Sequence, residues 1–300
     1  MKLTARLCAA DARRRHLLAA WLPADAVPTS ARFPVDTDDP VFARILAAGD
    51  DETLAFGVSG EAVFTPAELA GISHFELVCR AIARESPADF SANDAVRERT
   101  PLIDAGGPAP IRLMSGLSLT RITLKPNMVA SIGDWTQEYV LAAGVVKTFI
   151  DAHLSGASFL PLMKMNAKAR VARTDFVQVF SDAILGPAIV DTSVERITSR
   201  LPEEDGHLRH LGCLAYAHSA LQDRPDFNRT AEPWGGFHGW PSWVVSARVR
   251  DAFVASKLRG WHFRPVLVAK TEPYAEYVEK WSALRAAVAA SRSRMDGGRW

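Results

Sequence analysis

Three histidines and one cysteine lie close together in the segment HLRHLGCLAYAH, and their side chains are the ones in this sequence best suited to metal chemistry. Imidazole nitrogen and thiolate sulfur are donors that zinc accepts. His207, His210 and Cys213 follow at three-residue spacing, which predicts one helix, and His218 comes shortly after them. The spacing matches no standard zinc finger, and Gly212 interrupts the helical pattern. We therefore expect a helix packed through its leucines, with zinc as the alternative and no other cofactor.

A second group of residues suits recognition. The segment DFNRTAEPWGGFHGWPSW places large rings among glycines and prolines: Trp234, Phe237, His238, Trp240 and Trp243. Large rigid aromatic side chains dominate the energetics of many protein interfaces. We expect this loop to be a partner-binding surface, with rim charges such as Arg229 and Glu232. The alternative is a loop that folds over a sheet and buries its rings.

Motifs that identify large enzyme classes are missing from the sequence. It contains no GxxxxGK[ST], GxGxxG, HExxH or GxSxG pattern. His74 and Glu76 fall on one face of a predicted strand and could pair, but no nucleophile is placed beside them. We therefore assign no catalytic residue and favour a non-enzymatic protein. An enzyme of unrecognised family, with a pocket between the modules described below and a centre built on the histidines and Cys213, is the alternative.

The bulk composition narrows the partners and the compartment. A formal net charge of +1 gives no long-range field that would recruit DNA, RNA or an anionic membrane. The three cysteines are far apart and odd in number, which fits a reducing compartment. Arginines interrupt the first residues, and no window approaches the roughly 20 apolar residues of a membrane span. We expect a cytoplasmic protein whose partner is neither nucleic acid nor membrane.

An internal repeat supplies the elements that would position these residues. Residues 139–162 and 243–266 align without a gap at an offset of 104 and are identical at eight of 24 positions. Each copy reads as strand, helix, turn and strand. In the second copy Ser246 is a good N-cap, the stripe of Val249, Phe253, Val254 and Leu258 predicts a buried helix face, and Gly260 suits a helix C-terminus. Val145, Phe149, Ile150, Leu154 and Gly156 correspond in the first copy.

A weaker similarity lies upstream, between FTPAELAGISHFELV from Phe64 and FSDAILGPAIVDTSV from Phe180. The prediction is an α+β fold of two related strand-helix-strand modules with flanking N- and C-terminal helices. We place an N-terminal region with a helix near residues 4–21 in 1–63, the first module in 64–166 and the second in 167–270. Residues 271–300 form a C-terminal helix and a frayed tail. A scaffold in which the two modules mimic a dimer is a third interpretation.

The second copy also resembles a known signature. VVSARVRDAFVASKLRGWHFRPV is similar to the C-terminal segment of bacterial immunity-like proteins of polymorphic and contact-delivered toxin systems, especially the myxobacterial double-CxxCG group. The matching positions are Val244, Val245, Ser246, Arg248, Phe253, Leu258, Gly260, Trp261, Phe263, Pro265 and Val266. The two CxxCG pairs of that group are absent here, and the histidines from His207 onward lie in roughly the corresponding region. The resemblance implies a non-enzymatic protein that neutralises a cognate toxin by binding it.

What the two copies share is what a strand-helix-strand unit needs in order to fold. Function is therefore expected where they differ. Trp261 and His262 replace Ala157 and Ser158 of the first copy. We add Trp261 and His262 to the expected partner-binding residues.

Overall fold

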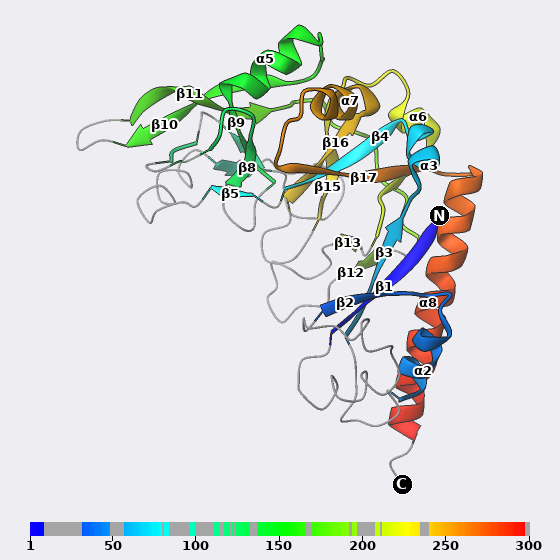
Figure 1. Cartoon of the computed structure of the whole chain (residues 1–300). Coiled ribbons are helices and arrows are strands. Elements are labelled where there is room, and N and C mark those ends of the chain that lie inside the picture. Colours follow the sequence, from blue (N-terminus) through cyan, green and yellow to red (C-terminus); the bar gives the residue numbers. More distant parts are fainter. Residues whose placement is uncertain are drawn as a thin grey trace.

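The computed structural model describes residues 1–8, 32–48, 57–79, 81–83, 97–99, 111–113, 117–119, 122, 124–132, 137–165, 170–191, 194–196, 208–210, 212–234 and 240–297. The fold is mixed α+β, as predicted, with helices placed between groups of strands along the chain (Figure 1). Among the described helices none is long and apolar enough to cross a membrane.

A five-stranded sheet contains the first predicted strand-helix-strand segment. Its order is β10 (Ser158–Met165), β11 (Arg170–Phe180), β9 (Tyr139–Ala142), β8 (Val129–Ile132) and β5 (Ile82–Ala83). Helix α5 (Ala143–Asp151) connects β9 to β10. We refer to this sheet with α5 as the first unit.

A seven-stranded sheet contains the second segment. Its order is β12 (Val194–Arg196), β13 (Leu208–His210), β15 (Phe227–Trp234), β16 (Trp240–Ser246), β4 (His74–Cys79), β17 (Trp261–Val268) and β14 (Ala215–Tyr216). Helix α7 (Ala247–Ala255) connects β16 to β17, and α6 (His218–Leu221) follows β14. We refer to this sheet with α7 as the second unit.

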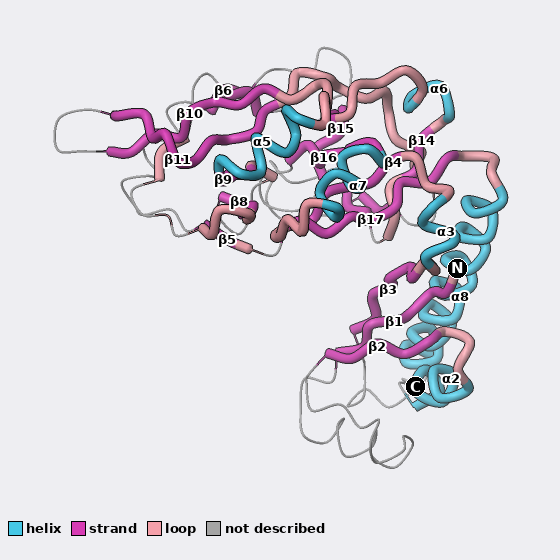
Figure 2. The backbone as a smooth tube through the Cα atoms, turned by 45° about the horizontal axis from the view of Figure 1, so that its top comes forward, coloured by secondary structure: helices cyan, strands magenta, loops and turns pink. Residues whose placement is uncertain are grey.

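A third layer joins the two ends of the chain. Strands β1 (Lys2–Cys8), β2 (Arg32–Asp36) and β3 (Gly57–Val63) form an antiparallel sheet, and α2 (Pro40–Ala48) and the long α8 (Glu272–Gly297) pack on it. Both views show this layer extending away from the other two sheets (Figure 2). Helix α3 (Pro66–Ala70) leads from it to β4, and β6 (Arg97–Arg99) pairs with β7 (Ile111–Leu113).

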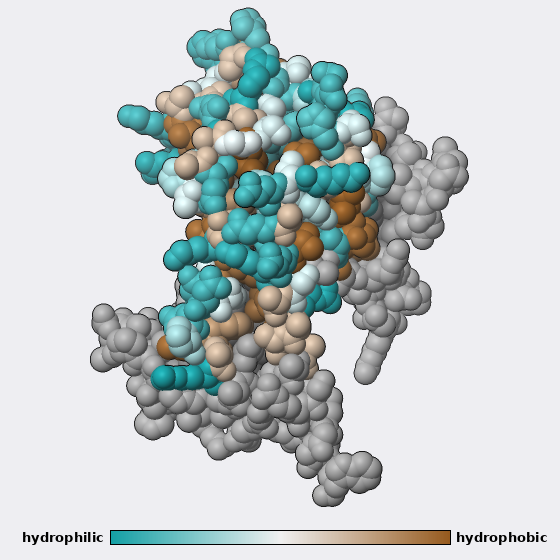
Figure 3. Space-filling view, turned by 90° about the vertical axis from the view of Figure 1, so that its right-hand side faces the viewer, coloured by the Kyte–Doolittle hydropathy of each residue, from teal (hydrophilic) through white to brown (hydrophobic). Residues whose placement is uncertain are grey.

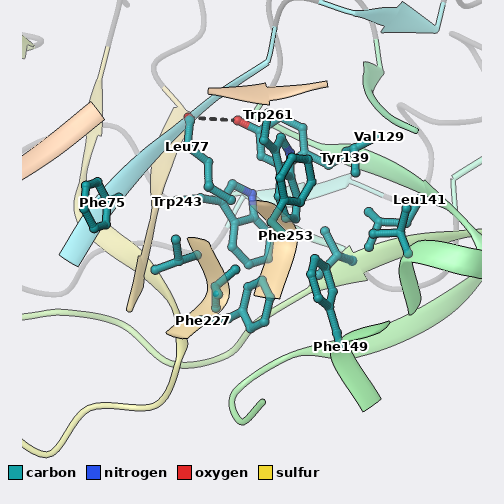
Figure 4. Packing of buried hydrophobic residues seen from close by; sticks show 14 residues of the cluster. Phe75, Leu77, Val129, Tyr139, Leu141, Phe149, Phe227, Trp243, Phe253 and Trp261 are labelled. Carbon is teal, nitrogen blue, oxygen red and sulfur yellow. Dashed lines mark hydrogen bonds between the residues drawn. The ribbon is translucent and has the colours of Figure 1, made fainter. Parts of the chain in front are cut away.

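The main aromatic core lies between the first and second units. Helices α5 and α7 lie side by side, and Val145, Phe149, Val249 and Phe253 point from them into one cluster. Trp261 lies at its centre, with its ring stacked on Phe149 at 5.8 Å and on Phe253 at 5.5 Å between centroids (Figure 4). Aromatic rings thus fill the interface between the units. The large apolar area that they bury stabilises this interface.

Two details of the two helices differ from the prediction. Ile150 and Val254 are 59% and 64% exposed, because the buried stripe runs through the residue just before each of them. Gly156 and Gly260 lie beyond the helix ends, where the left-handed residues are His153 and Lys257 instead.

Close backbone approach explains the two glycines. Gly260 has φ +114, and a Cβ there would lie 2.0 Å from the carbonyl oxygen of Val129. Gly156 has φ +82, and its Cβ would lie 2.6 Å from the carbonyl oxygen of Phe227. Each glycine therefore lets the loop after its helix touch a strand of the other unit.

The N-terminal prediction was wrong where it can be compared. The predicted helix near residues 4–21 overlaps β1, whose pairing with both β2 and β3 outweighs the local helical tendency. The rest of that range lies outside the described residues. The upstream similarity also fails as a structural match, because α3 is a helix whereas residues 181–191 contain no helix. The C-terminal helix is present as α8, with Tyr277 and Trp281 buried.

Candidate functional site

A buried carboxylate with two cationic partners is the most polar feature of the seven-stranded sheet. Glu76 lies on β4, between β16 and β17, opposite Arg264 of β17. Arg264 Nη1 donates to Glu76 Oε2 at 3.0 Å, and His210 Nε2 lies 3.1 Å from Glu76 Oε1. The side chains of Glu76 and His210 are buried, while that of Arg264 is 40% exposed. We call Glu76, His210 and Arg264 the charge cluster.

The protonation state of His210 follows from its contacts. Its Nδ1 lies 2.8 Å from the carbonyl oxygen of Gly212, and its Nε2 faces the Glu76 carboxylate. Both neighbours are acceptors, so both ring nitrogens must carry hydrogen for both contacts to be hydrogen bonds. Burial lowers the pKa of His210, but the charge of Glu76 and the hydrogen bond to it outweigh burial and raise that pKa above 6.5. The two acceptors around the ring therefore favour the imidazolium form of His210.

The pKa of Glu76 shifts in the complementary direction. Burial by itself would raise it, but the charge of His210, the hydrogen bond from it and the charge of Arg264 lower it to about 2. The hydroxyl of Ser242, which is also buried, contributes a further hydrogen bond. Glu76 therefore stays ionised at any physiological pH.

This order of groups orients a side chain and does not move protons. In a hydrolytic triad the histidine stands between the hydroxyl and the carboxylate and accepts the hydroxyl proton. Here Glu76 stands between Ser242 and His210, and His210 has no free lone pair. The arrangement therefore fixes the guanidinium of Arg264 on β17.

The predicted metal ligands do not converge. His210 belongs to the charge cluster, Cys213 is buried beside Tyr277 and Trp281, and His218 is exposed on α6. Burial raises the pKa of the Cys213 thiol to about 12. The single helix predicted for this segment was wrong, because strands β13 and β14 pair there with β15 and β17. His207 lies outside the described residues, and in the described part of the chain no three potential ligands form a group.

The predicted aromatic surface is largely core. Trp234, Trp243 and Trp261 are buried, so these three rings offer no surface to a partner. Trp234 and Trp243 lie on β15 and β16, which pair within the seven-stranded sheet and do not form a loop over it, and Trp261 lies on β17. The first two rings are therefore buried, as the alternative expected, but by strands of the sheet itself. Phe237, His238 and the side chain of Trp240 lie outside the described residues. His262 is exposed, as expected.

The expected rim charges are half-buried and bonded within the fold. The Cζ atom of Arg229 lies over the ring of Trp243, 4.5 Å from its centroid. The guanidinium also donates to the carbonyl oxygens of Gln137 and Pro241 at 3.1 and 2.6 Å. Burial lowers its pKa to about 10, which leaves it protonated at neutral pH. Burial raises the pKa of Glu232, whose Oε1 accepts from the backbone of Ala188. Both residues support the fold.

The polar residues of the immunity-like signature join the two units. Ser246 begins α7, but its hydroxyl donates to Asp226 at 2.6 Å and caps no helix amide. Arg248 Nη1 donates to Asp226 at 2.9 Å, and its Nη2 reaches the carbonyl oxygens of Ala152 and His153 at the end of α5. Asp226 also accepts from the backbone of Ser155 at 2.8 Å. The two units are thus linked by one hydrogen-bonded group around Asp226, which includes Ser155, Ser246 and Arg248.

The sequence offered a partial signal for the charge cluster. The sequence predicts Glu76 on a strand, with His74 on the same face as its partner. In the structure His74 contacts Ser73 instead. Arg264 interrupts an otherwise apolar strand, as Glu76 does, and two opposite charges in neighbouring buried strands predict a pair. That β4 and β17 are neighbours was not predictable from local pattern. No family model matches the chain, and no curated protein matches it.

Proposed function

We propose that the chain is a non-enzymatic, immunity-type protein of the cytoplasm that neutralises a cognate bacterial toxin by binding it. The contact surface in this proposal is the part of β17 that carries His262 and Arg264. The observation that carries it is the buried Glu76 holding an arginine that remains 40% exposed. His262 and Arg264 are two residues apart on one strand and so share one face of the sheet.

A fixed guanidinium is well suited to recognition. An arginine normally loses side-chain freedom when it binds, and this loss weakens association. The bond to Glu76 orders Arg264 in advance, and the planar guanidinium can donate to a partner carboxylate through its other edge. The charge cluster therefore favours an acidic group on the partner.

The first unit lacks these charges at the corresponding positions. Ser158, Leu160 and Gln178 lie in the same register on β10 and β11 as His262, Arg264 and Glu76 on β17 and β4. All three are uncharged. The charge cluster is therefore not required by the fold that the two units have in common. This difference supports a specific role for the second unit.

We propose further that residues 64–166 and 167–270 are duplicated copies at an offset of about 104. Helices α5 and α7 begin and end at that offset. A residue with left-handed backbone follows each helix at the corresponding position: His153 with φ 50 after α5, and Lys257 with φ 51 after α7. The bonds that close each helix also correspond: Leu154 N to Phe149 O and Leu258 N to Phe253 O, both at 3.1 Å.

The alternative, an enzyme with a pocket between the modules, is less well supported. Its pocket would lie where Trp261 stacks between Phe149 and Phe253. Of its proposed centre, His210 is fully hydrogen-bonded and the thiol of Cys213 is buried with a raised pKa. A binding function requires neither a pocket between the units nor a reactive His210 or Cys213.

Titration calorimetry tests the proposal. The full chain is titrated with the purified product of the neighbouring gene, the candidate toxin, and toxin activity is measured with and without the chain. The proposal expects a stoichiometric complex and loss of the toxin's activity. Absence of a complex, or turnover of the neighbouring product as a substrate, would contradict it.

A further inference from the structure

We infer that the two units exchange strands, so that the charge cluster is assembled from both halves of the chain. Strand β4 belongs to the first half in sequence but lies in the seven-stranded sheet, between β16 and β17. Strand β11 belongs to the second half but lies in the five-stranded sheet, between β10 and β9. This inference goes beyond the binding function and does not depend on it.

The two strands occupy equivalent places. Each pairs antiparallel with the strand before the helix and with the strand after it. The registers correspond at the helix offset of 104, as follows: Val177 of β11 with Leu141 and Pro161, and Phe75 of β4 with Val245 and Pro265. One step along, Gln178 and Glu76 are both buried polar residues. β4 and β11 are therefore the same element of two like units.

The chain crosses between the units after each of these strands. β4 is followed by β5, which pairs parallel with β8 in the first unit. β11 is followed by Ile184, which bridges to Arg229 of β15 in the second unit. The crossing bonds match: Ser131 N donates to Ala81 O and Arg229 N to Ala183 O, both at 2.7 Å. Each crossing is thus the counterpart of the other.

Further reciprocal contacts hold the units together. The backbone N–H of Phe227 in the second unit donates to Ser155 O in the first at 3.1 Å. The backbone N–H of Val129 in the first unit donates to Arg259 O in the second at 2.8 Å. Such mutual contacts are what the two subunits of a dimer with twofold symmetry make. The chain is a strand-exchanged dimer joined into one polypeptide.

The exchange has a consequence for the charge cluster. Glu76 comes from the first half of the chain, whereas His210 and Arg264 come from the second. A second half that kept β11 in place of β4 would set Gln178, an uncharged amide, against Arg264 and leave both cations without a counter-charge. The surface around Arg264 is incomplete without the first half.

Crosslinking of engineered cysteine pairs tests the exchange in the full chain. A protease site is placed between Met165 and Arg170, so that cleavage separates the two halves. Cysteines replace Val78 with His262, or Ser158 with Phe180, which are neighbours across strands in the exchanged arrangement. The control pairs use the same four positions in the unexchanged combination, Val78 with Ser158 and Phe180 with His262. A short thiol crosslinker is applied to the folded protein, which is then cleaved and denatured.

The exchanged pairs connect the two halves, so we expect a single band of full-chain mass after cleavage and denaturation. The control pairs lie within one half each, and we expect two separate bands for them, as for the chain carrying only its native cysteines. Two separate bands for the exchanged pairs, as for the control pairs, would overturn the inference.

Discussion

Glu76 is the residue on which the charge cluster depends. Its carboxylate compensates both His210 and Arg264 inside the sheet, and removing one member of a buried ion pair typically costs about 3–5 kcal/mol. We therefore expect Glu76→Gln, which introduces the amide found at Gln178, to lower the free energy of unfolding in urea by that amount. Lys147→Ala, which breaks an exposed pair with Asp151, is the control and should cost less than about 0.5 kcal/mol. A loss below about 1 kcal/mol for Glu76→Gln would contradict this account.

His210 makes the same cluster sensitive to pH. Because its pKa is raised in the folded state above 6.5, its contribution to stability is complete below pH 6.5 and is lost as pH rises through the raised pKa. We expect the destabilisation caused by His210→Asn to be larger at pH 6 than at pH 9. Urea unfolding of both proteins at the two pH values gives the difference directly. An equal difference at both would show that His210 is not an imidazolium in the fold.

The signature residues show how far single residues can be interpreted from sequence. Ser246 precedes a helix, as expected, but its hydroxyl does not make the expected cap hydrogen bond. Ser246 and Arg248 instead bind a common partner, Asp226. Their shared partner Asp226 was not foreseeable, because it lies some 20 residues away in sequence and meets them only through the pairing of β15 with β16. Residue types thus indicated a structural role, whereas the contacts came from the tertiary fold.

At the scale of elements, the loop after α7 gives a sharp prediction. Gly260→Ala would place a methyl group against the backbone of Val129 at a left-handed φ, and we expect it to lower the unfolding free energy by several kcal/mol. Gly71 is the matched control, because it has an ordinary φ of −84 and a Cβ there would meet Glu68 O at 3.6 Å. Thermal unfolding monitored by circular dichroism compares the two. Similar melting temperatures would contradict the close approach of the units.

Helices and their connecting strands could be predicted because their signals are local. The periodicity of Val145 and Phe149, and of Val249 and Phe253, located both helices with the buried side correctly assigned for these four residues. Ile150 and Val254 were misassigned because a stripe of adjacent apolar residues does not show where it stops. The place of β4 depends on pairing with strands more than 160 residues later, which no local pattern encodes.

For the whole molecule, the aromatic core predicts that the two units unfold together. Trp261 contacts rings from both units, and truncating a buried tryptophan typically costs about 3–5 kcal/mol. Trp261→Ala, which installs the residue found at position 157, should reduce stability by that amount while keeping one cooperative transition. His262→Ser, the neighbouring exchange toward the first copy, should change it by less than about 0.5 kcal/mol because His262 is exposed. Two separate transitions in the unsubstituted chain, or a loss below about 1 kcal/mol for Trp261→Ala, would contradict a shared core.

The surface of the whole molecule gives no simple indication of the partner. The face in Figure 3 mixes hydrophilic residues with smaller hydrophobic areas, and both signs of charge occur along the chain. More informative is the difference at three corresponding positions, which are uncharged in the first unit and include Arg264 and Glu76 in the second.

The most direct measurement of the central claim compares two equivalent surface positions. His262→Glu places a negative charge beside Arg264, whereas Ser158→Glu places the same charge at the corresponding exposed position of the first unit. Titration calorimetry with the product of the neighbouring gene gives the dissociation constant for each. We predict that His262→Glu weakens binding at least tenfold and that Ser158→Glu leaves it within twofold. Equal affinities for both variants, with the complex intact, would contradict a binding surface at His262 and Arg264.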